Sequence, residues 1–158
     1  MVKLIFIFAC LLTSSAFAQG WDSYANARFG ATASVPPGFL AMGPEANNSD
    51  GMIFRSRQGG ALLTIYGADV PGRNFEAYVE NQIAHEQSYS GWKIINRTIT
   101  PDWASYTGSI GSRFLSVRTI SSCNGRQAVS TKMEYNGNMG STVSKVERSL
   151  AAGPAKSC

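Results

Sequence analysis

The chain has 158 residues, a length typical of one domain with a substantial hydrophobic core. Its formal net charge is +4 at pH 7, and the charged residues are scattered, with no run of one sign. This pattern is typical of a solvated surface, and it argues against a nucleic-acid site, which needs clustered basic and aromatic residues. The single histidine excludes a metal site built from several histidines and a two-histidine nuclease mechanism.

The first eighteen residues have the features of a secretory signal peptide. Lys3 precedes an apolar run of about nine residues, too short to span a bilayer, and Ala16-Phe17-Ala18 forms a small-x-small cleavage site. We therefore expect cleavage after Ala18, a single mature domain over residues 19–158, and a periplasmic or secreted location without stable membrane insertion. Because Lys3 is the one charged residue removed, the net charge falls from +4 to +3.

The first part of the mature chain predicts a strand, a loop and a hairpin. Residues 19–27 form a polar lead-in, and weak alternation over 28–35 predicts a strand that ends at Pro36-Pro37-Gly38. Glycine, proline and asparagine over residues 39–50 indicate a loop. Strands over 52–57 and 61–66 flank a Gly-containing turn; the second is apolar on both faces, so it requires cover on both sides of its sheet.

A helix is predicted over residues 75–89, with Asn74 as its N-cap. Polar side chains, Glu86 among them, are assigned largely to the other side of this helix. Its apolar face is formed by residues at helical spacing: Phe75, Tyr78, Val79, Ile83 and Ala84.

Four further strands are predicted over residues 92–99, 103–109, 112–122 and 126–135. Asn124-Gly125, between the last two, is a strong hairpin signal and requires positive φ at both positions of a type I′ turn.

The chain ends with a second helix that reaches about residue 152. Ser141 or Asn138 would cap it, and Gly153-Pro154 would end it. Because the strands come in blocks rather than alternating singly with helices, the fold class is α+β, with an antiparallel sheet of about six strands covered by helices.

Two cysteines remain once Cys10 has left with the signal peptide, Cys123 and Cys158. An even pair in an exported chain indicates a disulfide bond. If the last helix runs back toward the hairpin, helix and tail together are long enough for Cys158 to reach Cys123. The alternatives are two free thiols, or a reactive or intermolecular Cys158.

Three stretches resemble exported bacterial proteins of unknown function. These are Asn26-Ala-Arg28-Phe29-Gly30, then Asp50-Gly51-Met-Ile-Phe54-Arg-Ser56, and Trp103-Ala-Ser105-Tyr-Thr-Gly108. The whole pattern is similar to the Mog1/PsbP-like fold, an antiparallel sheet between helices. The resemblance implies this architecture and a small partner-binding protein, and it supplies no shared catalytic residues.

Several side chains are candidates for a functional surface. His85, beside Glu86, would serve as a general base in a hydrolase, but an imidazole at the surface or its boundary is the preferred interpretation. No Gly-x-Ser-x-Gly motif supplies a serine nucleophile. Core or boundary packing is the favoured role of the aromatic residues, and a groove for a ligand or partner is the alternative. The candidate ligand or partner surface comprises Trp21, Tyr66, His85, Trp92, Trp103 and Tyr106.

The sequence thus predicts an exported, non-enzymatic accessory or binding protein that recognises a protein or an envelope component. It predicts no catalytic residue, no metal and no cofactor. A small-molecule binder with a pocket between sheet and helix is the first alternative, and a hydrolase that uses His85 is the second.

Overall fold

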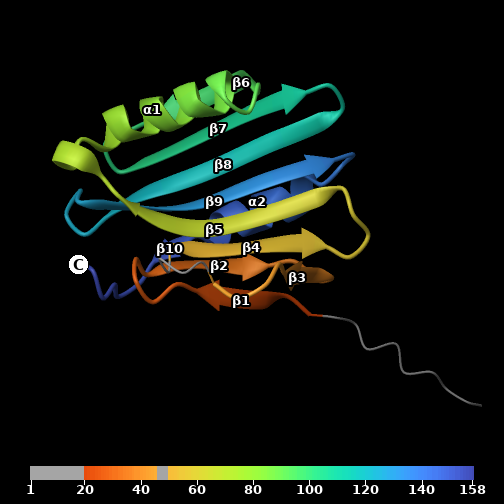
Figure 1. The fold of residues 1–158 in the computed structure, drawn as a ribbon, viewed down its shortest axis with the longest axis horizontal. Coiled ribbons are helices and arrows are strands. Elements are labelled where there is room, and N and C mark those ends of the chain that lie inside the picture. The colour runs from red at the N-terminus through yellow and green to blue at the C-terminus, as the bar shows by residue number, and fades with distance from the viewer. Residues whose placement is uncertain (1–19, 46–49) are drawn as a thin grey trace, which may run out of the picture.

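The computed structural model describes residues 20–45 and 50–158 (Figure 1). The predicted signal peptide and residues 46–49 of the predicted loop lie outside the described residues. The elements of the described part are β1 (Asp22–Ala25), β2 (Ala31–Val35), β3 (Phe39–Ala41), β4 (Gly51–Ser56), β5 (Ala61–Asp69), the 3-10 helix η1 (Pro71–Arg73), α1 (Phe75–Ser88), β6 (Lys93–Ile99), β7 (Trp103–Ile110), β8 (Arg113–Ser122), β9 (Gln127–Asn136), α2 (Gly140–Ser149) and β10 (Ala151–Ala152).

Seven strands form one antiparallel sheet in the order β3-β4-β5-β9-β8-β7-β6. A smaller antiparallel sheet has the order β1-β2-β10. Figure 1 shows α1 along the β6–β7 side of the large sheet and the small sheet beside β4. The predicted α+β class is confirmed, with seven strands rather than about six in the main sheet.

One face of the large sheet is covered by β2 and α2. Side chains alternate between the two faces of a strand, so Leu63 and Ile65 of β5 lie on the same face as Val129 and Met133 of β9. These residues form one hydrophobic cluster, and each fully buried aliphatic side chain contributes roughly 1.5–3 kcal/mol. From the covering layer, the cluster takes Phe29, Ala31, Ala33, Val35, Val143 and Val146.

The opposite face carries a second cluster beneath α1. Helical spacing brings Phe75, Tyr78, Val79 and Ile83 onto the sheet, as predicted. Their partners in the sheet and its flanking loops include Trp92, Ala104, Tyr106, Leu115, Val117 and Ala128. None of the helices in the described part is long and apolar enough to cross a membrane.

Gly67 in β5 allows the layer around β2 to approach the large sheet closely. A Cβ built on Gly67 would lie 2.2 Å from Cβ and 2.5 Å from Cγ of Phe29. Such distances are far inside van der Waals contact, so only glycine fits at this position. The space taken by Phe29 therefore depends on the missing side chain of Gly67.

The N-terminal part differs from the prediction in three ways. The strand predicted over residues 28–35 is β2, which is shorter and pairs with β1 and β10 instead of joining the main sheet. β1 lies in the predicted polar lead-in, and β3 lies in the predicted loop. These short edge strands form because a neighbouring strand supplies hydrogen bonds, and not because of a hydrophobic pattern of their own.

Helix α1 begins and ends close to the predicted limits. Asn74 caps it, since its side chain accepts a hydrogen bond from the Ala77 amide at 3.0 Å. Two positions on this helix differ from the prediction: Ala84 is exposed, whereas Glu86 is buried, with 6% of its surface exposed. Glu86 faces inward because Lys132 supplies a buried partner for its carboxylate.

Helix α2 is shorter than predicted and begins after Met139, without a side-chain cap from either Ser141 or Asn138. It ends at Ser149, whose hydroxyl accepts a hydrogen bond from the Ser34 amide at 2.8 Å. This contact brings the chain beside β2, where residues 151 and 152 pair as β10 instead of extending the helix.

Candidate functional site

Helix α1 covers only part of the face on which it lies (Figure 1). Over β3, β4 and β5 the same face carries exposed large apolar side chains: Leu40 is 47% and Ile53 45% exposed. Large apolar residues that lie together on a surface indicate an interaction site. We call this part of the sheet the open face, and it comprises Leu40, Ile53, Arg55, Leu62, Thr64 and Tyr66.

The strand register sets these side chains in rows across the open face. Leu40 lies opposite Arg55, and Arg55 lies opposite Leu62. Ile53 lies opposite Thr64 in the next row. Directly opposed side chains on antiparallel strands are roughly 5 Å apart, so the arginine lies between two leucines. The open face is therefore mainly apolar, and the positively charged side chain of Arg55 lies among its apolar residues.

Met42 extends the apolar surface along the edge of the sheet. It follows β3, is 48% exposed, and its amide donates a hydrogen bond to the Ile53 carbonyl at 2.8 Å. This bond places Met42 beside Ile53.

A line of charged residues separates the open face from the part of the sheet that α1 covers. Lys132 Nζ lies 2.6 Å from Glu86 Oε1 and 3.4 Å from Glu134 Oε1. Glu134 also pairs with Arg113, whose guanidinium lies over the ring of Trp92. Burial lowers the pKa of Lys132, but the hydrogen bond to Glu86 and the attraction of both carboxylates raise it above its ordinary value. Lys132 is therefore charged.

Tyrosine side chains lie beside this line of charges. Burial raises the pKa of Tyr66, although its hydrogen bond with Ser130 acts in the opposite direction. Burial also raises the pKa of Tyr78 and of Tyr106 above the ordinary value. All three phenols are therefore neutral at physiological pH, so they add polar groups but no charge beside the ion pairs.

A cavity of about 250 Å³ lies at one end of the open face. It forms where the turn between β4 and β5 meets the start of β8 and the end of β9. Arg55 and Leu62 line it from the open face, and Arg113 and Asn136 line it from the neighbouring strands. The cavity is thus continuous with the open face.

The residues that the sequence offered as a ligand or partner surface do not lie together. Trp92 and Tyr106 are each 3% exposed and pack in the cluster beneath α1, so both are core residues. Among the six, Tyr66 is the one that belongs to the open face.

The remaining three lie at separate places. His85 is exposed on α1, and its ring stacks on Tyr89 with the centroids 4.7 Å apart. Trp21 packs against the cluster under α2, and Lys145 lies over its ring. Trp103 is half-buried on the face opposite the open face, beneath the guanidinium of Arg118.

The sequence analysis missed Leu40, Met42, Ile53 and Arg55. A signal was present in the alternation over residues 52–57, where Met52 and Phe54 pack against the first cluster while Ile53 and Arg55 point the other way. Whether Ile53 and Arg55 are covered depends on how far α1 extends across the sheet. A local sequence pattern does not show the extent of that cover.

Metal ligands and cysteine thiols are the other groups that could carry chemistry. Within residues 20–45 and 50–158, no group of three His, Cys, Asp or Glu side chains is arranged to hold a metal ion. Cys123 and Cys158 are joined in a disulfide, with their Cα atoms 5.6 Å apart. Both sulfur atoms are therefore engaged in a covalent bond.

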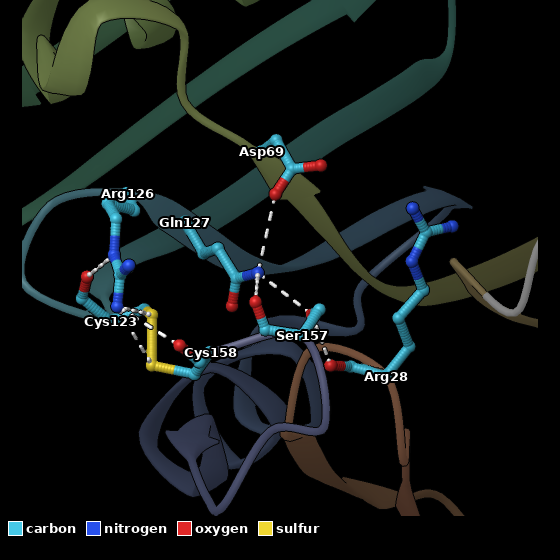
Figure 2. The surroundings of a disulfide bond; sticks show 7 residues. All are labelled: Arg28, Asp69, Cys123, Arg126, Gln127, Ser157 and Cys158. Carbon is cyan, nitrogen blue, oxygen red and sulfur yellow. Dashed lines mark hydrogen bonds between the residues drawn. A yellow bond between two sulfur atoms is a disulfide. The ribbon is translucent and has the colours of Figure 1, made fainter.

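The disulfide lies at the tip of the β8–β9 hairpin (Figure 2). Asn124 and Gly125 have φ of 55° and 77°, as the predicted turn requires, and Cys123 also has a positive φ of 52°. The Arg126 amide donates to the Cys123 carbonyl at 3.2 Å and closes the turn. Arg126 also donates from its guanidinium to the Cys158 carbonyl at 3.1 Å.

The C-terminal tail connects this hairpin to the N-terminal layer (Figure 2). The buried Gln127 donates to the hydroxyl of Ser157 at 2.8 Å, and that hydroxyl donates to the Arg28 carbonyl at 2.5 Å. The amide of Lys156 donates to the Ala27 carbonyl at 3.1 Å. The disulfide therefore fastens a tail that bridges the two sheets, at the end of the molecule away from the cavity.

Comparisons with known proteins define the fold class. No family model matches the chain, and no curated protein matches its sequence. Two solved structures are similar in fold: the Saccharomyces cerevisiae Ran-binding protein Mog1p, at 7% identity, and a mutant of the protein Mog1, at 8% identity.

The alignment with each structure has a TM-score of 0.57 and covers 96% of the other chain. It covers 85% of this chain for Mog1p and 84% for the Mog1 mutant. The likeness confirms the Mog1-like α+β fold that the sequence motifs implied. At such low identity it establishes the fold alone.

Proposed function

We propose that this chain is an exported, non-enzymatic binding module that recognises a protein partner through its open face. The observation that carries the proposal is the position of Leu40 and Ile53, which are exposed on a regular sheet surface beside α1. Exposing such side chains favours association, because burying them against a partner removes apolar surface from water.

The fold neighbour supports a protein partner. The yeast protein Mog1p is described as Ran-binding, so a chain of this fold does bind another protein. The identity of 7% supplies no shared binding residues, and the partner of the present chain is argued from its own surface.

The exported location rests on the first eighteen residues, which contain a basic n-region, a short apolar run and the Ala16-Phe17-Ala18 cleavage site. Expression of the full chain in a bacterium with the general secretion pathway tests it. We expect the periplasmic product to begin at Gln19, as read by intact mass. A cytoplasmic product that retains residues 1–18 would argue against export.

The surroundings of His85 argue against the hydrolase alternative. Its imidazole is exposed and stacked on Tyr89, while the neighbouring Glu86 turns inward to Lys132. The pair therefore lacks the geometry of a base held by an acid beside a substrate cleft.

A small-molecule site between sheet and helix is also less well supported. The cavity between α1 and β6, lined by Ile83, Ile94 and Ile95 among others, has a volume of about 210 Å³. Typical ligand sites enclose roughly 300–1,000 Å³ and are lined mostly by apolar side chains. The hollow between α2 and β8 is larger, at about 340 Å³, but charged and hydroxyl side chains form most of its lining, namely Arg118, Ser144, Glu147 and Arg148. The open face is thus the better candidate for the functional surface.

Affinity capture with matched variants tests the proposed function. The mature protein, Ile53→Arg and Ile95→Arg are immobilised separately and exposed to periplasmic extract, and bound proteins are quantified by mass spectrometry. Ile95 is an apt control because it is 56% exposed and lies on β6, at the opposite edge of the sheet. We expect Ile53→Arg to lose the specific partner and Ile95→Arg to retain it. Loss with Ile95→Arg alone would favour the site between α1 and β6.

A further inference from the structure

The cavity at the end of the open face combines positive charge with an apolar rim. Arg55 and Arg113 both line it, and Leu62 lies between their strands on the open face. The volume of about 250 Å³ suits a single side chain of a partner better than a whole ligand.

The negative charge in this region is already engaged. Glu134, the acidic residue of the cavity lining, pairs with Arg113 and with Lys132. Glu86, on the other side of Lys132, is held by that lysine at 2.6 Å. Arg55, in contrast, has no hydrogen-bond or ion-pair partner among the residues that the structure describes, and it is exposed. The cavity therefore offers an unused guanidinium.

A neutral donor lines the same cavity as this guanidinium. Asn136 lines the cavity, and its side-chain nitrogen lies 3.6 Å from where a Cβ on Gly60 would be. Gly59 and Gly60 have φ of 77° and 73°, so the turn depends on glycine and leaves this side of the cavity free of side chains. Guanidinium and amide groups together form a recognition site for a carboxylate.

We propose, on the basis of the proposed function, that the partner is a protein segment that places an acidic side chain in this cavity and an apolar side chain on the open face. Arg55 and Ile53 are two residues apart on β4, a separation of about 6.6 Å along a strand. An acidic residue and an apolar residue two positions apart in an extended segment match this distance. A second copy of this chain is a poorer fit, because the chain without its predicted signal peptide still carries a formal charge of +3.

Nuclear magnetic resonance titration with a defined probe tests this inference. The probe is an acetylated and amidated hexapeptide with leucine at position 2, glutamate at position 4 and serine elsewhere, so that its apolar and acidic side chains are two positions apart, and the comparison peptide has glutamine in place of glutamate. Both are added to the uniformly ¹⁵N-labelled mature protein and to its Arg55→Gln and Arg73→Gln variants. Arg73 is a matched control because it is an exposed arginine beside Gly125, at the other end of the sheet.

We expect the glutamate peptide to shift the amide signals of residues 53–62 and 136, and to bind about tenfold more tightly than the glutamine peptide. Arg55→Gln should remove this preference, and Arg73→Gln should retain it. Equal binding of the two peptides at the open face would overturn the acidic-partner inference while leaving the proposed function intact. Shifts confined to another surface, or no binding of the glutamate peptide, would also overturn it.

Discussion

Lys132 of β9 and Glu86 of α1 form an ion pair across the middle of the large sheet, with 2.6 Å between Nζ and Oε1. Glu86 is buried and Lys132 is half-buried, and both are surrounded by the cluster under α1 on one side and by the open face on the other. The pair therefore holds the C-terminal part of α1 over the sheet. It lies at the boundary between the sheet surface that α1 covers and the open face.

Removing one member of this pair should destabilise the fold more than removing both. Lys132→Met leaves the Glu86 carboxylate buried without its cation, and we expect a loss of about 2–3 kcal/mol in the free energy of unfolding. The double variant Glu86→Leu/Lys132→Met should recover more than half of that loss. Urea unfolding of the wild type, Lys132→Met, Glu86→Leu and the double variant measures both quantities. A loss additive over the two sites would show that the residues are not coupled.

Stability should fall in alkaline solution. Burial and the nearby Glu45 carboxylate raise the pKa of Tyr24 to about 12, from an ordinary value of 10.0, and the pKa of Tyr66, Tyr106 and Lys132 is also raised. Above pH 10 the unfolded chain releases these protons while the folded chain retains them, so the stabilisation is lost as pH rises.

Urea unfolding at about pH 8 and about pH 11 measures this effect, and tyrosinate absorbance follows the ionisation directly. We expect the buried phenols to ionise together with unfolding. Tyr106→Phe should move the alkaline transition to higher pH. Ionisation of all tyrosines in a chain that stays folded would contradict the burial described here.

The disulfide should contribute a large share of the stability. It closes a loop of 35 residues, for which the chain-entropy model gives about 4 kcal/mol. Reduction, or Cys158→Ala, should lower the unfolding free energy by that order and release the tail that bridges Gln127 and Arg28. Trypsin cleavage at Lys156 reports the release. Equal protease resistance with and without reductant would show that the tail is held without the bond.

Gly67→Ala should be costly because the new methyl group would overlap Phe29. We expect a loss of about 2–3 kcal/mol, the upper range for an overpacked core. Phe29→Gly removes the obstacle, including the Cβ of residue 29, so the double variant should be no less stable than Phe29→Gly alone. Thermal unfolding of the single and double variants measures the coupling. A Gly67→Ala protein as stable as the wild type would mean that the β2 layer is not so close to β5.

Local patterns predicted the elements whose residues carry their own signal. Three predicted features are each encoded in a few neighbouring residues, and all three are present. They are the β5 run that is apolar on both faces of the strand, the Asn74 N-cap of α1 and the Asn124-Gly125 turn. The inward positions of α1 followed from helical periodicity for the same reason. Glu86 broke that pattern, because its partner Lys132 is 46 residues away.

The open face could not be predicted in this way. Ile53 and Leu40 are apolar residues on strands, and such residues are usually buried. Their exposure follows from the limited reach of α1 and from the position of β3 at the edge of the sheet. Trp92 and Tyr106 were candidates for a functional surface because they are aromatic, but both are core residues.

Site-specific photo-crosslinking tests most directly whether the open face binds a protein partner. A benzophenone amino acid is placed at Leu40, at Ile53 or at the control position Ile95, and each exported protein is irradiated in intact cells. We predict the same discrete crosslinked protein from positions 40 and 53 and none of it from position 95. Crosslinking of one partner from position 95 alone, or none from positions 40 and 53, would contradict the account.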